Sequence, residues 1–404
     1  MHKIIRKFPA ALFLALYIFP ASALEAGPEI MARAAVLMDA KTGVILYQKN
    51  PSLPHPPASL AKIMTIHILL EKISAGELSL NQEIRPPEAS WATNLPRDSS
   101  LMFLGPGQRL TLLDLLKGLA VSSGNDAAVA AAILSSGSVP AFTGLMNEEA
   151  RKMGCGGLFF AEPSGYDARS SITALDFARF LRIYVSRHPQ ALAALHSLRE
   201  FTYPRQENMP EGNGPNPITQ TNRNSLLFSY PGADGIKTGY LDESGYNIAL
   251  SAQRGAMRLI LVLLGERGAS PQAGIRARDG DSRRLLDFGF DNFTTQKFSS
   301  PAPQAVRVWK GEQEQIVPEA PAEILLTIPK GTENHLKGEI SQTLYVTAPV
   351  KKGDILGTLR VSLEEKIIYE GKLTAASDVP RGSWWDVFTD SIIIFFRDLF
   401  GYPV

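Results

Sequence analysis

The pattern of apolar residues changes once along this chain of 404 residues, close to Phe293. Before this point, segments with helical periodicity alternate with short strands. Residues 301–380 instead form short runs rich in valine, isoleucine and threonine, separated by glycine, proline and lysine. A chain of this length is expected to form two or three domains. We therefore predict an α/β domain over residues 24–293, a small all-β domain over 294–380, and a separate terminal segment over 381–404.

The first domain is expected to begin with two strands between Ala32 and Gln48, joined by a turn at Asp39–Gly43. The apolar run from Leu60 to Leu70 predicts a helix, because the two prolines before it suit a helix start. The later patterns predict elements of both kinds: two helices within 110–134 broken at 122–124, a helix over 173–185 with Thr173 as N-cap, an exposed loop over 204–217, adjacent strands at 246–252 and 258–264, and a helix over 281–288.

The first residues predict that the chain is exported. A basic start at Lys3, Arg6 and Lys7 precedes an apolar run from Phe8 to Phe19, and the small residues of 21–23 follow. This order is typical of a secretory signal peptide, which we place at residues 1–23. The alternative is a membrane-spanning anchor, but the apolar run falls short of the ~20 residues that a helix needs to cross a bilayer.

Charge and cysteine content exclude several classes of function. The chain has 41 basic and 40 acidic residues, and losing the three basic side chains of residues 1–23 takes the net charge from +1 to −2. This balance argues against a nucleic-acid partner. Cys155 is the one cysteine, so neither an internal disulfide nor a thiolate metal cluster can form. Six scattered histidines without a His-Glu-x-x-His pair argue against a zinc hydrolase, and we expect no metal or cofactor.

The first candidate catalytic motif is Ser59-x-x-Lys62, at the start of the helix after the prolines. Residues three apart share a helix face, so the Ser59 hydroxyl and the Lys62 amine are expected to be neighbours. Serine needs a base to become a good nucleophile, and lysine can serve if its pKa is lowered. The plainer interpretation is an N-cap serine and a solvated lysine.

Two further motifs follow, and each occurs twice. Ser123-Gly124-Asn125 lies between two predicted helices, where the serine hydroxyl could relay a proton and the asparagine amide could hold a substrate amide. Ser79-Leu80-Asn81 has the same spacing but lies in a loop.

Lys237-Thr238-Gly239 precedes a predicted strand. Its lysine offers a cation, its threonine a hydroxyl, and its glycine lets the backbone approach a carboxylate closely. Its copy, Lys41-Thr42-Gly43, occupies a predicted hairpin turn.

In this order, the three motifs resemble those of the serine penicillin-recognising acyl transferases, and most closely the D-alanyl-D-alanine carboxypeptidases of the low-molecular-mass penicillin-binding proteins. The stretches 57–65, 123–127 and 245–247 also carry the resemblance, which runs from about Ala32 to Phe290 and continues loosely to the end. It implies a β-lactamase/transpeptidase-like α/β domain with an antiparallel sheet flanked by helices and a helical subdomain, then the all-β domain and an amphipathic helix.

The same resemblance implies roles for the motif residues. Ser59 would be the nucleophile and Lys62 its general base, with Ser123 relaying a proton and Asn125 clamping a substrate amide. These residues would act through an acyl-enzyme.

The substrate's terminal carboxylate is expected to lie near Lys237, Thr238 and Gly239, and the oxyanion hole would use the backbone N–H groups of the nucleophile and of Tyr240. Arg278, or else Arg276, would help bind the carboxylate. Tyr240-Leu241 departs from the smaller or hydroxylated residues found in many relatives.

The implied activity is removal of the terminal D-alanine from peptidoglycan stem peptides ending in D-Ala-D-Ala, by an enzyme that β-lactams acylate. A β-lactamase or esterase on the same fold is one alternative; a class A enzyme would need a Glu-x-x-Leu-Asn loop before Lys237, which the sequence lacks. A catalytically dead wall-binding protein is the other, and the intact motifs argue against it.

The terminal segment predicts an amphipathic helix from Ser383 to Phe400. Its apolar face holds Trp384, Trp385, Phe388, Ile392, Phe395 and Leu399, while Asp386, Asp390 and Arg397 lie opposite. Such a helix suits a membrane interface, whereas its charges exclude a spanning helix. We therefore expect peripheral attachment, in the periplasm or at the outer face of the cytoplasmic membrane. The alternative is packing of the apolar face on the all-β domain.

Overall fold

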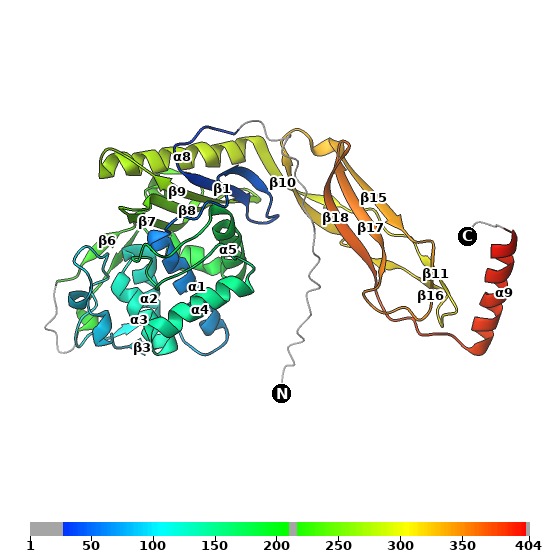
Figure 1. The fold of residues 1–404 in the computed structure, drawn as a ribbon, viewed down its shortest axis with the longest axis horizontal. Helices are drawn as coiled ribbons and strands as arrows, with labels where there is room; N and C mark the ends of the chain where they lie inside the picture. The colour runs from blue at the N-terminus through cyan, green and yellow to red at the C-terminus, as the bar shows by residue number, and fades with distance from the viewer. Residues whose placement is uncertain (1–26, 210–215, 401–404) are drawn as a thin grey trace. The chain divides into compact units, whose positions relative to one another are not determined.

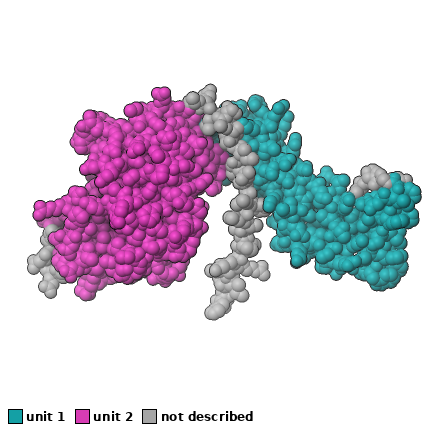
Figure 2. Space-filling view, viewed as in Figure 1, with its two compact units in different colours: residues 1–23, 293–404 teal, residues 24–292 magenta. Residues whose placement is uncertain are grey.

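A computed structural model describes residues 27–209 and 216–400. The predicted signal peptide at 1–23 lies outside these residues. The described chain divides into two compact units, one ending at Asn292 and one beginning at Phe293 (Figure 2).

The first unit is built on a five-stranded antiparallel sheet in the order β2-β1-β9-β8-β7. Helix α8 (Pro271–Asn292) lies against one face and α5 (Ala174–Arg187) against the other (Figure 1). Strand β9 is buried along almost its whole length because both faces are covered. The strands are β1 (Ala34–Asp39), β2 (Ile45–Lys49), β7 (Ala233–Leu241), β8 (Gly245–Arg254) and β9 (Met257–Glu266).

A helical subdomain packs beside this sheet. Its central helix is α1 (Lys62–Ser74), which a single 3₁₀ turn, η1 (Ala58–Ala61), precedes. Helix α3 (Asn125–Ser136) is rich in buried alanine, and small side chains let it pack closely on its neighbours. The other helices of the subdomain are α2 (Leu112–Lys117), the π-helical turn η4 (Gly118–Ser122) and α4 (Val139–Lys152).

Short elements complete the first unit. They are β3 (Glu83–Ile84), η2 (Glu88–Ser90), η3 (Ala92–Asn94), β4 (Leu110–Thr111), α6 (Pro189–Ala191), the π-helical turn η5 (Leu192–His196), β5 (Glu200–Thr202), η6 (Gln206–Asn208), β6 (Thr219–Thr221) and α7 (Leu226–Ser229). The predicted loop over 204–217 therefore contains the 3₁₀ turn η6.

Most elements of the first unit agree with the sequence patterns, including the Thr173 cap, whose hydroxyl accepts a hydrogen bond from the Asp176 N–H. The prediction for α8 was too short, because the helix begins at Pro271 and not near residue 281. The sequence did not predict the first turns of α8, because Gly274 lies within them and glycine disfavours helices. A Cβ there would come within 2.1 Å of the Tyr246 ring, so close packing requires a residue that disfavours helices.

The second unit consists of short strands and one terminal helix, as predicted. Two separate clusters of buried apolar residues form its core, one around Val306 and one around Leu359. Its elements are β10 (Phe293–Ser299), β11 (Val306–Trp309), β12 (Gln315–Ile316), β13 (Pro318–Glu319), β14 (Glu323–Pro329), η8 (Glu333–His335), β15 (Leu336–Gln342), β16 (Tyr345–Thr347), β17 (Ile355–Leu363), β18 (Lys366–Ala375) and α9 (Trp384–Phe400).

Helix α9 contacts the strands of its own unit through its polar face. Asp390 is buried and accepts a hydrogen bond from the Lys310 N–H, and the Arg397 guanidinium lies 4.7 Å from the centre of the Tyr345 ring. The apolar face stays exposed; Trp384, for example, is 70% exposed. Among the described residues, no single helix meets the length and hydropathy of a membrane span, and α3 and α4 do so only together, across an 85° bend.

Candidate active site

Ser59 and Lys62 lie together at the start of α1. Ser59 belongs to the 3₁₀ turn η1, and Lys62 is the first residue of the helix that follows. Residues three apart are eclipsed in a 3₁₀ turn, which brings the Lys62 Nζ to 3.0 Å from the Ser59 Oγ. Lys62 is fully buried, and its amine also donates to Asn125 Oδ1 at 2.7 Å and to the Ser164 carbonyl at 2.8 Å.

The surroundings of Lys62 prepare it to act as a base. The pKa of its amine is lowered from 10.5 to about 7, mainly by burial and to a smaller extent by the positive charge of Arg223. The carboxylates of Glu162 and Asp126 act in the opposite direction. An amine with a pKa near 7 is substantially neutral at physiological pH and can accept the serine proton.

This pKa predicts a pH dependence. Below pH 7 the Lys62 amine is protonated and cannot accept a proton, so acylation of Ser59 should accelerate as pH rises through about 7 and then level off. Stopped-flow measurement of penicillin acylation from about pH 5 to about pH 10 would test this. A rate that is flat across pH 7, or rises only toward pH 10, would contradict the role of Lys62.

Ser123 and Asn125 lie on a sharp turn between η4 and α3. Ser123 adopts a left-handed conformation, with φ of 61°, that ends one helix and redirects the chain into the next. Gly124 is required here, because a Cβ would lie 2.5 Å from Asp126 Oδ1 and 2.9 Å from the Met102 nitrogen. Asn125 reaches Lys62 directly. Within the described part of the chain, the buried Ser123 hydroxyl makes no hydrogen bond to Lys62 or Ser59.

Lys237, Thr238 and Gly239 lie on β7, beside the turn that carries Ser59. A Cβ on Gly239 would meet the Pro57 carbonyl oxygen at 2.8 Å and the Ser59 nitrogen at 3.0 Å, so glycine allows the nucleophile to approach the strand. Lys237 is buried, and its amine donates to the Thr238 carbonyl at 3.2 Å. Burial, followed by the charges of Lys62, Arg223 and Arg278, lowers the pKa of Lys237 well below its usual value.

The second Lys-Thr-Gly lies in the β1–β2 hairpin turn, as predicted. The Asp39 carboxylate accepts hydrogen bonds from the backbone N–H groups of Lys41 and Thr42, and Gly43 has a φ of 78°. These contacts stabilise the turn.

A loop that the sequence did not indicate closes the site beneath Ser59. It runs through Glu162, Ser164 and Gly165 and supplies the carbonyl that holds Lys62. Gly165 has a φ of 77°, and a Cβ there would lie 1.8 Å from the Ala58 carbonyl oxygen. The Glu162 carboxylate accepts from the Ser164 N–H at 2.7 Å, so it stabilises its own loop.

Two arginines near the site differ in exposure. Arg278 is buried on α8, where it binds Asp279 Oδ1 at 2.7 Å and Ser225 Oγ at 3.3 Å, and it is not among the residues lining the cleft. Arg223, which the sequence did not indicate, is exposed and donates to the Ser100 hydroxyl at 2.8 Å. Arg276 is exposed on the same helix as Arg278.

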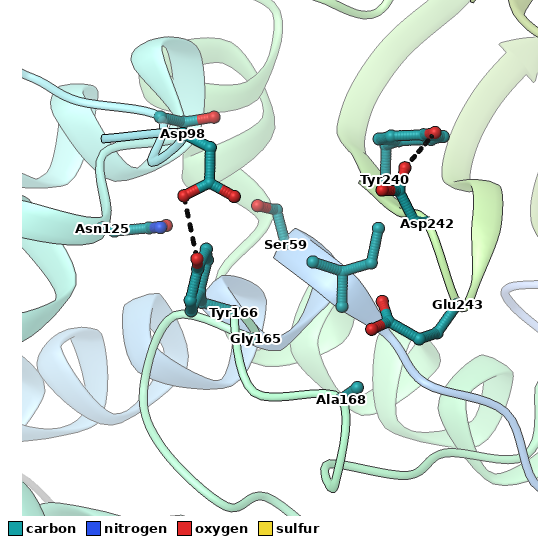
Figure 3. A pocket seen from close by; sticks show the side chains of 11 residues that line it. Ser59, Asp98, Asn125, Gly165, Tyr166, Ala168, Tyr240, Asp242 and Glu243 are labelled. Atoms are coloured by element: carbon teal, nitrogen blue, oxygen red, sulfur yellow. Dashed lines mark hydrogen bonds between the residues drawn. The ribbon is translucent and has the colours of Figure 1, made fainter. Parts of the chain in front are cut away.

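These segments enclose a cleft of about 440 Å³. Figure 3 shows Ser59 between Asn125 on one wall and Tyr240 on the other. Tyr240 is half exposed and donates to Asp242 at 2.6 Å, while Tyr166 donates to Asp98 at 2.8 Å on the opposite side. The lining residues are Ser59, Asp98, Ser100, Asn125, Gly165, Tyr166, Ala168, Tyr240, Leu241, Asp242 and Glu243.

Comparison with known proteins identifies this architecture. A family profile described as D-alanyl-D-alanine carboxypeptidase matches residues 21–268, and one described as the C-terminal domain of penicillin-binding protein 5 matches residues 293–381. The chain belongs to the D-alanyl-D-alanine carboxypeptidase family. The similarity to individual members of this family extends over almost the whole chain. The D-alanyl-D-alanine carboxypeptidase DacC of Escherichia coli (strain K12) is 36% identical over 96% of this chain and 95% of its own length.

Solved structures of similar proteins match much of this chain. The crystal structure of penicillin binding protein 5 from Haemophilus influenzae has a TM-score of 0.79 and 32% identity, and covers 88% of this chain and 100% of its own. Penicillin-Binding Protein D2 from Listeria monocytogenes, in an ampicillin-bound form, covers 66% of this chain and 100% of its own, at 27% identity and a TM-score of 0.54. The expected fold and the class of serine-type peptidase are thereby confirmed.

Proposed function

We propose that this carboxypeptidase removes the terminal D-alanine from peptidoglycan stem peptides, through an acyl-enzyme on Ser59. The observation that carries the proposal is the Ser59–Lys62 pair, in which a buried amine with a lowered pKa lies 3.0 Å from the serine hydroxyl. The activity named for the relatives supports the choice of substrate.

The proposed chemistry has two stages. Lys62 takes the proton from Ser59 as the oxygen attacks the carbonyl between the two D-alanines, and the backbone N–H groups of Ser59 and Tyr240 stabilise the oxyanion. Collapse breaks the peptide bond, and the leaving D-alanine nitrogen receives the proton, with Ser123 as the relay. Water then hydrolyses the ester and releases the shortened peptide.

The remaining motif residues orient the substrate. We assign the clamping of a substrate amide to Asn125, and the terminal carboxylate region to Lys237, Thr238 and Gly239. Arg278, or else Arg276, is the arginine that we expect to help bind this carboxylate; Arg278 is buried on α8, and its charge contributes to the lowered pKa of Lys237.

A fluorescent penicillin and a D-Ala-D-Ala peptide together test this function. Covalent labelling of the wild type, with none of Ser59→Ala, supports the acyl-enzyme, and release of free D-alanine separates a carboxypeptidase from a β-lactamase or esterase. Labelling of Ser59→Ala would show that another nucleophile is used, and an unlabelled wild type would indicate a dead scaffold.

Lys237→Ala should lower substrate capture and acylation by about 10- to 100-fold, because it removes the buried amine to which we assign the substrate's terminal carboxylate. The melting temperature should change little, since burial already disfavours the charged amine. The matched control is Lys41→Ala in the other Lys-Thr-Gly, which should keep wild-type kinetics. A larger loss of kcat/KM in Lys41→Ala would reverse the assignment.

We also propose that the chain is exported through a signal peptide at residues 1–23 and then held at the outer face of the cytoplasmic membrane by α9. The apolar side chains of α9 remain exposed while its polar face is bound to the strands, which supports lipid as their partner. Burying several such side chains at about 25 cal/mol per Å² is worth several kcal/mol, enough for reversible attachment.

Ending the chain after Pro380 should therefore move the enzyme from the membrane fraction to the soluble fraction, with turnover of short peptides unchanged. Phe388→Glu combined with Phe395→Glu should do the same in the full chain, because charge on the exposed face opposes burial in lipid. Asp390→Asn, on the face bound to the strands, is the matched control and should stay with the membrane. Loss of turnover in the shortened, folded enzyme would place α9 in the fold and not at the membrane.

A further inference from the structure

A second group of polar side chains lies inside the helical subdomain, outside the cleft. His67 and Glu71 lie one turn apart on α1, and His188 directly follows α5. Both imidazoles are buried, whereas Glu71 is partly exposed and connects the group to solvent. None of the three lines the cleft or enters the proposed mechanism.

Three potential ligand atoms converge at this point. His188 Nε2 lies 3.1 Å from His67 Nδ1 and 2.9 Å from Glu71 Oε1, and all three atoms are within 4.8 Å of one another. An N–H on His188 Nε2 can point at only one of its two neighbours, and an N–H on His67 Nδ1 instead leaves the His188 lone pair facing the Glu71 carboxylate. A cation would satisfy all three atoms together.

A carboxylate behind His67 completes the arrangement. Glu149, on α4, places its Oε1 at 3.5 Å from His67 Nε2, and this nitrogen makes no hydrogen bond to the described residues. Metal-binding histidines usually donate their second N–H to a carboxylate, which fixes the tautomer. Glu149 is placed to accept that proton if a metal ion takes the other nitrogen.

The charged side chains around the group carry more negative than positive charge, which favours binding of a divalent cation. Arg187 lies 3.4 Å from Glu71 Oε2 and 3.8 Å from Glu149 Oε1, so two carboxylates face one arginine.

We propose that His67, Glu71 and His188 bind one divalent transition-metal ion of the Zn²⁺ type. Two imidazoles and one carboxylate are a donor set that suits zinc, and a water molecule fills the fourth position. Because the ligands come from α1 and the end of α5, with Glu149 on α4, the ion ties these three helices together. It thereby stabilises the helix whose first residue is Lys62.

The test is calorimetric titration of the chelator-treated full chain with ZnCl₂ and with MgCl₂. We expect one Zn²⁺ per chain, an upward shift of several degrees in the melting temperature at saturation, and no comparable binding of Mg²⁺, which prefers oxygen ligands. Co²⁺ in place of Zn²⁺ should show the visible absorption of a tetrahedral site in the unmodified protein. The absence of stoichiometric Zn²⁺ binding would overturn the proposal.

Glu→Gln variants at the proposed site and at matched positions outside it test where the ion binds. Glu71→Gln should weaken Zn²⁺ binding by at least about 100-fold, and Glu149→Gln by about 10- to 100-fold. Glu77→Gln and Glu148→Gln, at exposed positions near the same helices and paired with Lys72 and Lys152, should leave it unchanged. Equal binding by Glu71→Gln and Glu77→Gln would place the ion elsewhere.

Discussion

Replacing Lys62 by alanine should slow acylation of Ser59 by about two to four orders of magnitude, the usual contribution of a well-placed general base. The nucleophile itself is unchanged in this variant, but no other amine lies within hydrogen-bonding distance of its hydroxyl in the described structure. Stopped-flow kinetics with a fluorescent penicillin, alongside circular dichroism, measure the effect separately from folding.

The control is Lys72→Ala on the same helix. Lys72 is a surface residue that pairs with Glu77 at 2.8 Å, so its loss should change neither acylation nor stability appreciably. A folded Lys62→Ala enzyme that acylates at nearly the normal rate would require a different base.

The second large effect is expected at Gly165. In Gly165→Ala the new methyl group meets the Ala58 carbonyl oxygen at 1.8 Å, next to the nucleophile, and the loop that holds Lys62 must move. We expect a loss of about 2 to 4 kcal/mol in stability from the left-handed backbone and the overpacking. Acylation should fall by about 100-fold, because misplacement of catalytic groups by about 1 Å has this effect.

The control Gly76→Ala separates the effect of the left-handed backbone from the effect of overpacking. Gly76 has the same φ of 77° as Gly165, but nothing lies within 4 Å of its added Cβ. This control should lose about 1 kcal/mol through backbone strain alone and keep full activity. Similar melting temperatures and acylation rates in the two variants would mean that the contact with Ala58 is easily relieved.

The structure brings Ser59, Lys62 and Asn125 together, and the sequence could indicate each of them because each belongs to a local motif. Ser59 and Lys62 are three residues apart, and Asn125 follows a helix break that Ser123 and Gly124 already indicated. No local pattern shows that β7 lies beside η1. That the three motifs belong to one site was inferred from their order along the chain and from the family resemblance.

The parts that the sequence missed act through tertiary contacts. Glu162, Gly165 and Arg223 lie in irregular loops, where no period marks a functional side chain, and each matters only through its distance from Lys62 or Ala58. Asp126 follows Asn125 directly, yet its role is to accept backbone hydrogen bonds from Met102 and Leu104, a segment more than twenty residues away. These interactions depend on the folded chain.

The docking of α9 through Asp390 and Arg397 has a consequence for orientation. These residues are seven positions apart, two turns along one face, so their contacts with Lys310 and Tyr345 prevent the helix from rotating about its own axis. A helix on a flexible linker could attach to lipid at any angle and leave its domain free to tumble. Here the exposed aromatic face has a fixed direction relative to the strands. The proposed attachment through this face would therefore also determine which side of the all-β unit faces the bilayer.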